Sequence, residues 1–290
     1  MFYLIATILL NVLISVFFKL FPKYKIDTLQ AIVANYCVCV ITGSLFTGHI
    51  PFTGGGALHT DWMPWALFMG IGFISIFNLL GYSTRVDGIT TTTIANKLSL
   101  VIPVVFSLIV YKEHAGIGKV AGILLAFPAI YLTAHVKGDD NKPQSLLPPL
   151  LIFVGGGMLD TLTNYIQLHF LGNVETQAAF TTTCFASAGT IGVTLITILV
   201  ILGKTKIKLR NIVAGICLGV PNYFSIYFFI RMLNSNVLQS SASIPVLNIG
   251  ILAVSALTAI ALFREHVNIL RIIGLALSVG AILLIAFGDK

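Results

Sequence analysis

The chain consists largely of apolar runs that are each about as long as a membrane-spanning helix. A helix needs about 20 mostly apolar residues to cross the hydrocarbon core of a bilayer. The runs are continuously apolar, whereas the strands of a membrane barrel alternate over about ten residues. The sequence therefore predicts an all-α, polytopic membrane protein with ten transmembrane helices, at residues 2–20, 28–47, 62–83, 89–111, 116–134, 147–170, 176–202, 210–233, 237–262 and 268–287.

The shortage of charged residues supports this fold class. Charged residues make up 9% of the 290 residues and hydrophobic residues 57%, whereas a soluble domain carries roughly 25% charged residues. The net charge is +7, but the basic residues lie at the ends of the apolar runs, where they anchor a protein among lipid headgroups. Membrane lipid is therefore the expected partner, and nucleic acid is not.

The cysteines give no sign of a metal or cofactor. All four lie inside apolar runs, and Cys37 and Cys39 are spaced C-x-C without a neighbouring histidine or carboxylate. Two thiols alone make a poor metal site, so we expect small buried side chains, no metal and no cofactor. The first run starts at Phe2 with no basic segment before it, which favours a retained helix over a cleaved signal peptide.

An internal repeat divides the chain into a first half at 1–140 and a second half at 141–290. A shift of 152 residues aligns the end of the first half with the end of the second without a gap. It pairs Asn96 with Asn248, Lys112-Glu113-His114 with Arg264-Glu265-His266, Lys119 with Arg271, and Gly122 with Gly274. The starts of the halves match more weakly, with Asn11 near Asp160 and Thr28 near Thr176. The halves are expected to hold five helices each.

An odd number of helices per half implies opposite insertion. The second five-helix half then enters the membrane inverted relative to the first, as in many secondary transporters. Two similar halves of opposite orientation can exchange conformations, which turns an outward-open cavity into an inward-open one.

The repeated segments resemble the EamA-type halves of the drug/metabolite transporter superfamily. The resemblance rests on Thr90 to Asn96, Pro103, Lys112-Glu113 and Gly122 in the first half, and on Ser240 to Pro245, Arg264-Glu265 and Gly274 in the second. It implies a ten-helix carrier of small metabolites, often an exporter. It also implies a central cavity lined by helices one to four and six to nine, with helices five and ten peripheral.

The distribution of basic residues departs from that family. Its ten-helix members have both termini in the cytoplasm. Here most basic residues lie in the odd-numbered connections between helices, and the opposite side carries only Lys112, Lys119, Arg231 and Lys290. The positive-inside rule therefore favours external termini. The expected location is the cytoplasmic (inner) membrane of a prokaryote.

Two ionisable residues lie well inside the predicted spans, where such groups are costly and usually face a cavity or another helix. Asp160 shares one helical face with Thr163, Asn164 and Gln167. A carboxylate there could accept a proton or a cationic substrate group. Lys97 could hold an anionic group or pair with Asp160. The alternatives are ordinary helix–helix contacts, or a Lys97 side chain that reaches the membrane surface.

Further polar residues are candidates for substrate binding. Asn96 and Asn248 would line opposite sides of the cavity, or only join helices. Pro221 begins a polar cluster that could face helix three, and Pro103 and Pro245 are expected to bend their helices. Glu113 and Glu265 should lie on opposite membrane faces, each at the start of the next helix, in structural or gating roles. The remaining candidates are Asn11, Asn78, Tyr82, Asn222, Tyr223 and Tyr227.

These features favour a secondary active transporter of a small polar metabolite, such as an amino acid or sugar. Transport would be ion-coupled export or exchange, driven by protons or sodium, in a monomer or homodimer. No Walker motif is present. The alternatives are a non-transporting membrane scaffold and an integral-membrane enzyme acting on a lipid headgroup. An enzyme would cluster its histidines, but these are scattered at His49, His59, His114, His135, His169 and His266. No catalytic residue is predicted.

Overall fold

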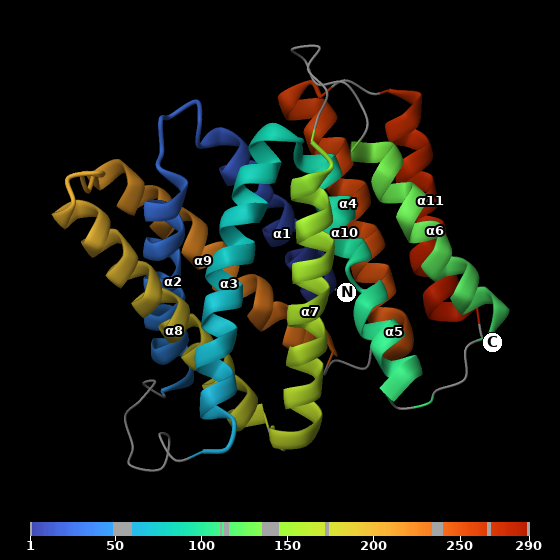
Figure 1. Ribbon diagram of the computed structural model, residues 1–290, viewed down its shortest axis with the longest axis horizontal. Coiled ribbons are helices and arrows are strands. Elements are labelled where there is room, and N and C mark those ends of the chain that lie inside the picture. The colour runs from blue at the N-terminus through green and yellow to red at the C-terminus, as the bar shows by residue number, and fades with distance from the viewer. Residues whose placement is uncertain are drawn as a thin grey trace. The chain divides into compact units, whose positions relative to one another are not determined.

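A computed structural model describes residues 2–48, 60–110, 112, 116–134, 145–171, 174–233, 240–265 and 268–288. The described chain is all-α (Figure 1). Its helices are α1 (Phe2–Leu20), α2 (Thr28–Thr47), α3 (Met63–Val86), α4 (Ile89–Leu98), α5 (Val101–Val110), α6 (Ile117–Ala134), α7 (Leu147–Phe170), α8 (Val174–Ile201), α9 (Leu209–Leu233), α10 (Ser240–Phe263) and α11 (Ile269–Phe287). Each predicted run corresponds to one helix, except that 89–111 forms both α4 and α5.

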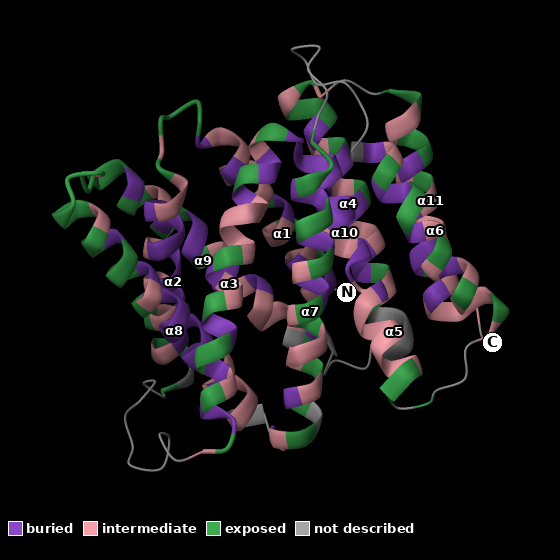
Figure 2. Ribbon diagram, in the orientation of Figure 1, coloured by how far each residue is buried: buried purple, intermediate pink, exposed green. Residues whose placement is uncertain are grey.

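The helices have the lengths and composition of a multi-pass membrane protein. Eight stretches of the described chain are long and apolar enough to span a bilayer, with α4 and α5 counted together as Ile89–Val110. α6 contains a shorter apolar stretch, Ile117–Thr133. In α7, the polar residues from Asp160 onward lower the hydropathy. Many positions on the helices are exposed (Figure 2). Many of the exposed side chains are large and apolar, which suits contact with lipid.

The chain forms two compact units. Unit 1 contains Met1–Lys19, Leu79–Thr161 and Ser225–Lys290, and unit 2 contains Leu20–Asn78 and Leu162–Phe224. α3, α7 and α9 each contribute to both units. Each unit draws residues from both expected halves, so the boundary near residue 140 stays a prediction about the repeat.

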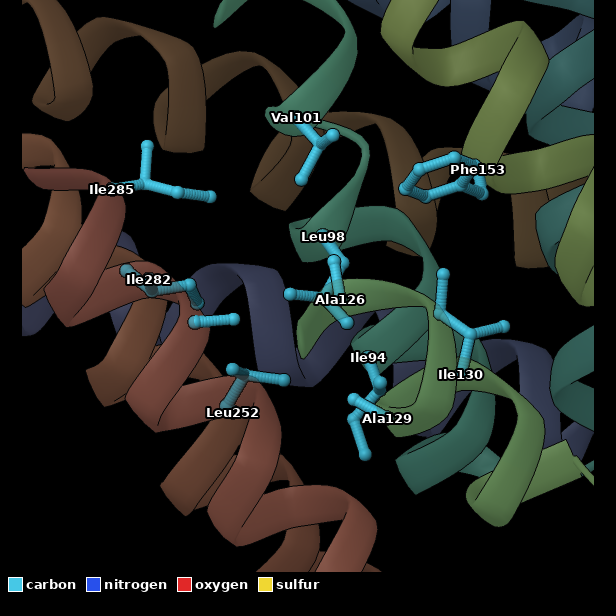
Figure 3. Close-up of a cluster of buried hydrophobic side chains, with 11 residues drawn as sticks. Ile94, Leu98, Val101, Ala126, Ala129, Ile130, Phe153, Leu252, Ile282 and Ile285 are labelled. Carbon is cyan, nitrogen blue, oxygen red and sulfur yellow. The ribbon is translucent and has the colours of Figure 1, made fainter. Parts of the chain in front are cut away.

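The core of unit 1 joins α4, α5, α6, the first part of α7, α10 and α11. Figure 3 shows Ile94 and Leu98 of α4 packed with Ala126 and Ala129 of α6 and with Leu252 of α10. All five residues are almost completely buried. This cluster fixes α4 in place up to its last turn.

Glycines set the close approach of α6 and α11, which lie side by side in Figure 1. A Cβ on Gly122 would lie 2.8 Å from the carbonyl oxygen of Ala281, and one on Gly274 would lie 3.0 Å from that of Ala129. The start of α6 also meets the end of α11, at Gly288. The two helices therefore run antiparallel, with small residues at their interface.

Unit 2 contains a second antiparallel pair, α2 and α8. A Cβ on Gly189 would lie 3.6 Å from Tyr36, and one on Gly192 would contact Val33, so the two helices run in opposite directions. Cβ atoms on Gly215 and Gly219 of α9 would likewise contact α2, at Ala34 and Val38, so α9 runs parallel to α2. α2 is thus held closely between two neighbours.

Among the described residues, three other than glycine adopt a positive φ: Lys25 (51°), Lys112 (53°) and Arg264 (50°). The last two are equivalent positions under the shift of 152 residues. Lys112 and Arg264 therefore share a conformation that is rare for residues with a Cβ.

Candidate functional site

The helix that was expected at 89–111 is broken in its middle. α4 ends at Leu98, α5 begins at Val101, and Ser99 and Leu100 form the break. Pro103 explains it, because proline has no N–H and its ring clashes with the carbonyl group four residues earlier, which is that of Ser99. The Ile102 N–H donates to that carbonyl oxygen instead, at 3.0 Å. The expected bend at Pro103 is thus a two-residue turn between α4 and α5, after which the Val104 N–H donates to the Leu100 carbonyl oxygen at 3.3 Å. Pro245, in contrast, lies inside the helical range of α10.

α7 approaches this break through glycines. A Cβ on Gly157 would lie 2.7 Å from the Ser99 carbonyl oxygen, and one on Gly156 would lie 3.7 Å from Oδ1 of Asn96. A larger residue at position 157 would push α7 away. All of these residues belong to unit 1. The broken backbone and the side chains around it therefore form one local arrangement.

Asp160 lies next to the break. The Ser99 hydroxyl is 3.4 Å from Asp160 Oδ2 and 2.6 Å from the carbonyl oxygen of Asn96. The positive charge of Lys97 and the negative charge of Asp160 attract each other. The structure therefore brings three of the predicted residues together, Asn96, Lys97 and Asp160, and adds Ser99, which the sequence analysis did not single out.

The exposure of these residues bears on what they can bind. Lys97 and Asn96 are half-buried, whereas Asp160 is exposed. Asn164 and Gln167, further along the same face of α7, are also exposed. Lipid is a poor environment for such groups, so their exposure fits a surface that water and polar solutes reach.

Other predicted residues of unit 1 make separate, local contacts. Nδ2 of Asn11 donates to the Thr7 carbonyl oxygen at 2.9 Å, within its own helix. Asn248 is buried in α10. Tyr82 lies beneath the guanidinium group of Arg85. Nε of Arg231 donates to the Tyr227 hydroxyl at 3.1 Å.

In unit 2, the structure reveals a buried polar cluster that sequence reasoning found only in part. Nδ2 of Asn222 lies 3.1 Å from Oδ1 of Asn35 and 3.6 Å from Sγ of Cys39, and Tyr223 beside it is buried. Asn78 instead donates to the Ile74 carbonyl oxygen within α3, at 2.8 Å. Asn35 is a polar residue within an apolar run of the sequence, but nothing in its spacing indicated its partner.

Cys39 and Cys184 are buried as expected, whereas Cys37 is half-buried and Cys217 exposed. Within the described residues, no group of three or more His, Cys, Asp or Glu side chains could hold a metal ion.

Glu265 has a different role from the expected one at the start of the following helix. It accepts a hydrogen bond from the Ile89 N–H at 2.9 Å, so its charge meets the positive end of α4 rather than α11. Asn268 caps α11 instead, by accepting from the Leu270 N–H. Lys19 Nζ lies 3.3 Å and Arg271 Nη1 3.9 Å from the Glu265 carboxylate. The equivalent Glu113 lies outside the described residues.

Comparisons with known proteins give a bacterial homologue and a protein of similar fold, without adding an activity. No family model matches the chain. A protein of unassigned function from Haemophilus influenzae is 27% identical over 296 residues, covering 99% of this chain and 98% of that protein. One solved crystal structure matches with a TM-score of 0.55 at 14% identity, covering 96% of this chain and 95% of the other. The chain is thus a multi-pass membrane protein with a bacterial homologue, and its similarity to the solved structure concerns the fold alone.

Proposed function

We propose that this protein is a secondary active transporter of a small polar metabolite, which binds beside the break between α4 and α5. This proposal rests mainly on one observation, the break between α4 and α5 with Asp160 next to it. Interrupted helices in membrane transporters expose backbone groups and helix ends where substrates and coupling ions bind. A break in mid-span is otherwise unfavourable, because its backbone groups lose regular helical partners.

The charges at the break indicate the kind of solute. Asp160 can bind an ammonium group or a proton, and Lys97 can bind a carboxylate or another anion. The carbonyl end of α4 carries partial negative charge and the N–H end of α5 partial positive charge. The arrangement therefore favours a zwitterion such as an amino acid over a neutral sugar, with protons or sodium as the coupling ion.

Two further observations support alternating access by an inverted repeat. The helices that are equivalent in the repeat, α6 with α11 and α2 with α8, run antiparallel. Equivalent helices have this relation when the halves insert in opposite directions. Lys112 and Arg264 also share a rare backbone conformation at equivalent positions. Membership of the drug/metabolite transporter superfamily and a location in the inner membrane belong to the same proposal.

The proposal is tested by ligand binding and then by transport. The purified protein is screened by thermal shift against amino acids, sugars, nucleosides and amphiphilic drugs, and any ligand found is then tested for uptake into proteoliposomes. We expect Asp160→Asn and Lys97→Ala to abolish the shift. Ser75→Ala is the matched control, because Ser75 is exposed and bonds only within α3.

A ligand whose binding is unchanged in both site variants would exclude this site. Proteoliposomes that move no ligand would favour the scaffold or, if a lipid headgroup is altered, the membrane enzyme.

A further inference from the structure

A basic pocket lies in unit 2, and its lining includes none of the residues at the α4–α5 break. It is formed by the connection between α1 and α2 together with the connection between α8 and α9. Its cavity of about 290 Å³ is lined by Lys25, Asp27, Gln30, Gly203, Lys204, Thr205, Lys206, Lys208, Arg210 and Asn211. Five of these side chains are basic and one is acidic, so the pocket is strongly positive.

The floor of this basic pocket is a fixed polar network. Gln30 and Asn211 are buried, and Nδ2 of Asn211 donates to Oε1 of Gln30 at 2.7 Å. Nε2 of Gln30 in turn donates to the Thr205 hydroxyl at 2.8 Å and to the Lys206 carbonyl oxygen at 3.1 Å. The Asp27 N–H donates to Oδ1 of Asn211 at 3.1 Å. One glutamine thus joins the two connections, and the pocket is built before any ligand arrives.

The backbone holds the basic residues in place at both helix ends. The Ile26 N–H donates to the Phe21 carbonyl oxygen in the turn that follows α1. The Lys204 N–H donates to the carbonyl oxygen of Leu199 at the end of α8, and both distances are 2.9 Å. In the first of these turns Lys25 has a φ of 51°, a left-handed backbone conformation that glycine usually adopts. A lysine there carries backbone strain that a glycine would not.

We propose that this pocket binds a phosphate group. Five cationic side chains around a fixed polar floor suit a compact oxyanion with several acceptor oxygens, and Arg210 can donate two parallel hydrogen bonds to it. The neighbouring side chains Tyr24, Ile207 and Leu209 are 60%, 61% and 75% exposed. They provide an apolar rim beside which acyl chains can lie. The phosphate can belong to an anionic phospholipid or to a soluble phosphorylated compound.

The test compares both sources on the full-length protein in detergent. In one arm, inorganic phosphate and pyrophosphate are titrated at constant ionic strength and binding is followed by thermal shift. In the other arm, native mass spectrometry measures how much phosphatidylglycerol stays bound to the protein, compared with phosphatidylcholine. The double variant Lys206→Gln/Lys208→Gln removes two lining charges. Lys23→Gln is the matched control, because Lys23 lies on the same connection but does not line the pocket.

We expect the affinity to fall about fivefold for each lining charge removed, since a basic residue near an anionic headgroup contributes about 1 kcal/mol. The control should keep the wild-type affinity, and Lys206→Arg/Lys208→Arg should restore binding. Saturable binding in the first arm identifies a soluble phosphate, and selective retention in the second identifies a lipid. The proposal is overturned if neither arm shows binding, or if Lys23→Gln weakens binding as much per charge. Neither arm measures solute transport at the α4–α5 break, so the result for the phosphate pocket is independent of the proposed transport function.

Discussion

At the scale of single residues, Asp87 is an unusual carboxylate. It lies in the turn between α3 and α4, with no surface exposed. Its Oδ2 accepts a hydrogen bond from the Ser83 hydroxyl at 2.7 Å, while Oδ1 is buried without a partner among the described residues. Burial raises the pKa of Asp87 above its ordinary 3.8, although Ser83, Lys19 and Arg271 counteract the increase. The neutral form is therefore favoured more in the folded protein than in the unfolded chain.

This shift predicts a pH dependence of stability. A raised pKa means that the contribution of Asp87 to folding is complete below about pH 3.8 and is lost as the pH rises through the folded-state pKa. Asp87→Asn should remove this dependence, so its melting temperature should fall less than that of the wild type on going from acid to neutral pH. Thermal unfolding in detergent across that range measures the difference.

Asp61→Asn serves as the control, because Asp61 is exposed. Its pH profile should parallel that of the wild type. Parallel profiles for all three proteins would show that Asp87 does not titrate differently on folding.

At the scale of elements, the break between α4 and α5 depends on one proline. Pro103→Ala restores an N–H that can donate to the Ser99 carbonyl oxygen, and alanine favours helix over proline by about 3 kcal/mol. We expect the variant to form one continuous helix with slower hydrogen exchange around residues 99–104, and to lose the ligand-induced thermal shift.

Pro64→Ala is the control for this experiment. Pro64 is the second residue of α3, where proline costs no helical hydrogen bond. If Pro103→Ala shows slower hydrogen exchange but unchanged ligand binding, the break is not required for binding.

The antiparallel pair of α6 and α11 makes a second prediction at this scale. In Gly122→Ala the new Cβ would lie 2.8 Å from the Ala281 carbonyl oxygen, so the helices must separate. We expect a loss of about 1–3 kcal/mol in stability. Gly280→Ala is the matched control on α11, because nothing lies within 4 Å of its added Cβ. It should be neutral or slightly stabilising, and equal losses in both variants would contradict the packing argument.

At the scale of the whole molecule, hydrophobic run length predicted the membrane class and nearly every helix boundary, because the bilayer imposes both. The break at Ser99 was only partly predictable, since proline bends some helices and interrupts others. Asp160 and Lys97 were found because charge is rare within spans. The cluster of Asn35 with Asn222 and the contact of Glu265 with α4 were missed, because each joins residues that are more than 170 positions apart.

The orientation of the molecule in the membrane also stays a prediction. The basic residues favour external termini. Alkaline phosphatase fused after Lys290 should therefore be active in intact cells. Green fluorescent protein fused at the same place should be non-fluorescent. The reverse result would place the C-terminus in the cytoplasm, as the resemblance to the drug/metabolite transporters implies.

The break between α4 and α5 has no counterpart in α10, the helix that the shift of 152 residues aligns with them. Under the shift of 152 residues, the position of Pro103 is taken by Ser255, which lies inside α10. Two identical inverted halves would give outward-facing and inward-facing forms of equal energy, since one form is the other turned over. A single interrupted helix removes that degeneracy. If the halves exchange conformations as proposed, the difference between Pro103 and Ser255 contributes to the resting preference of the carrier, and with it to the side from which an empty molecule first binds its substrate.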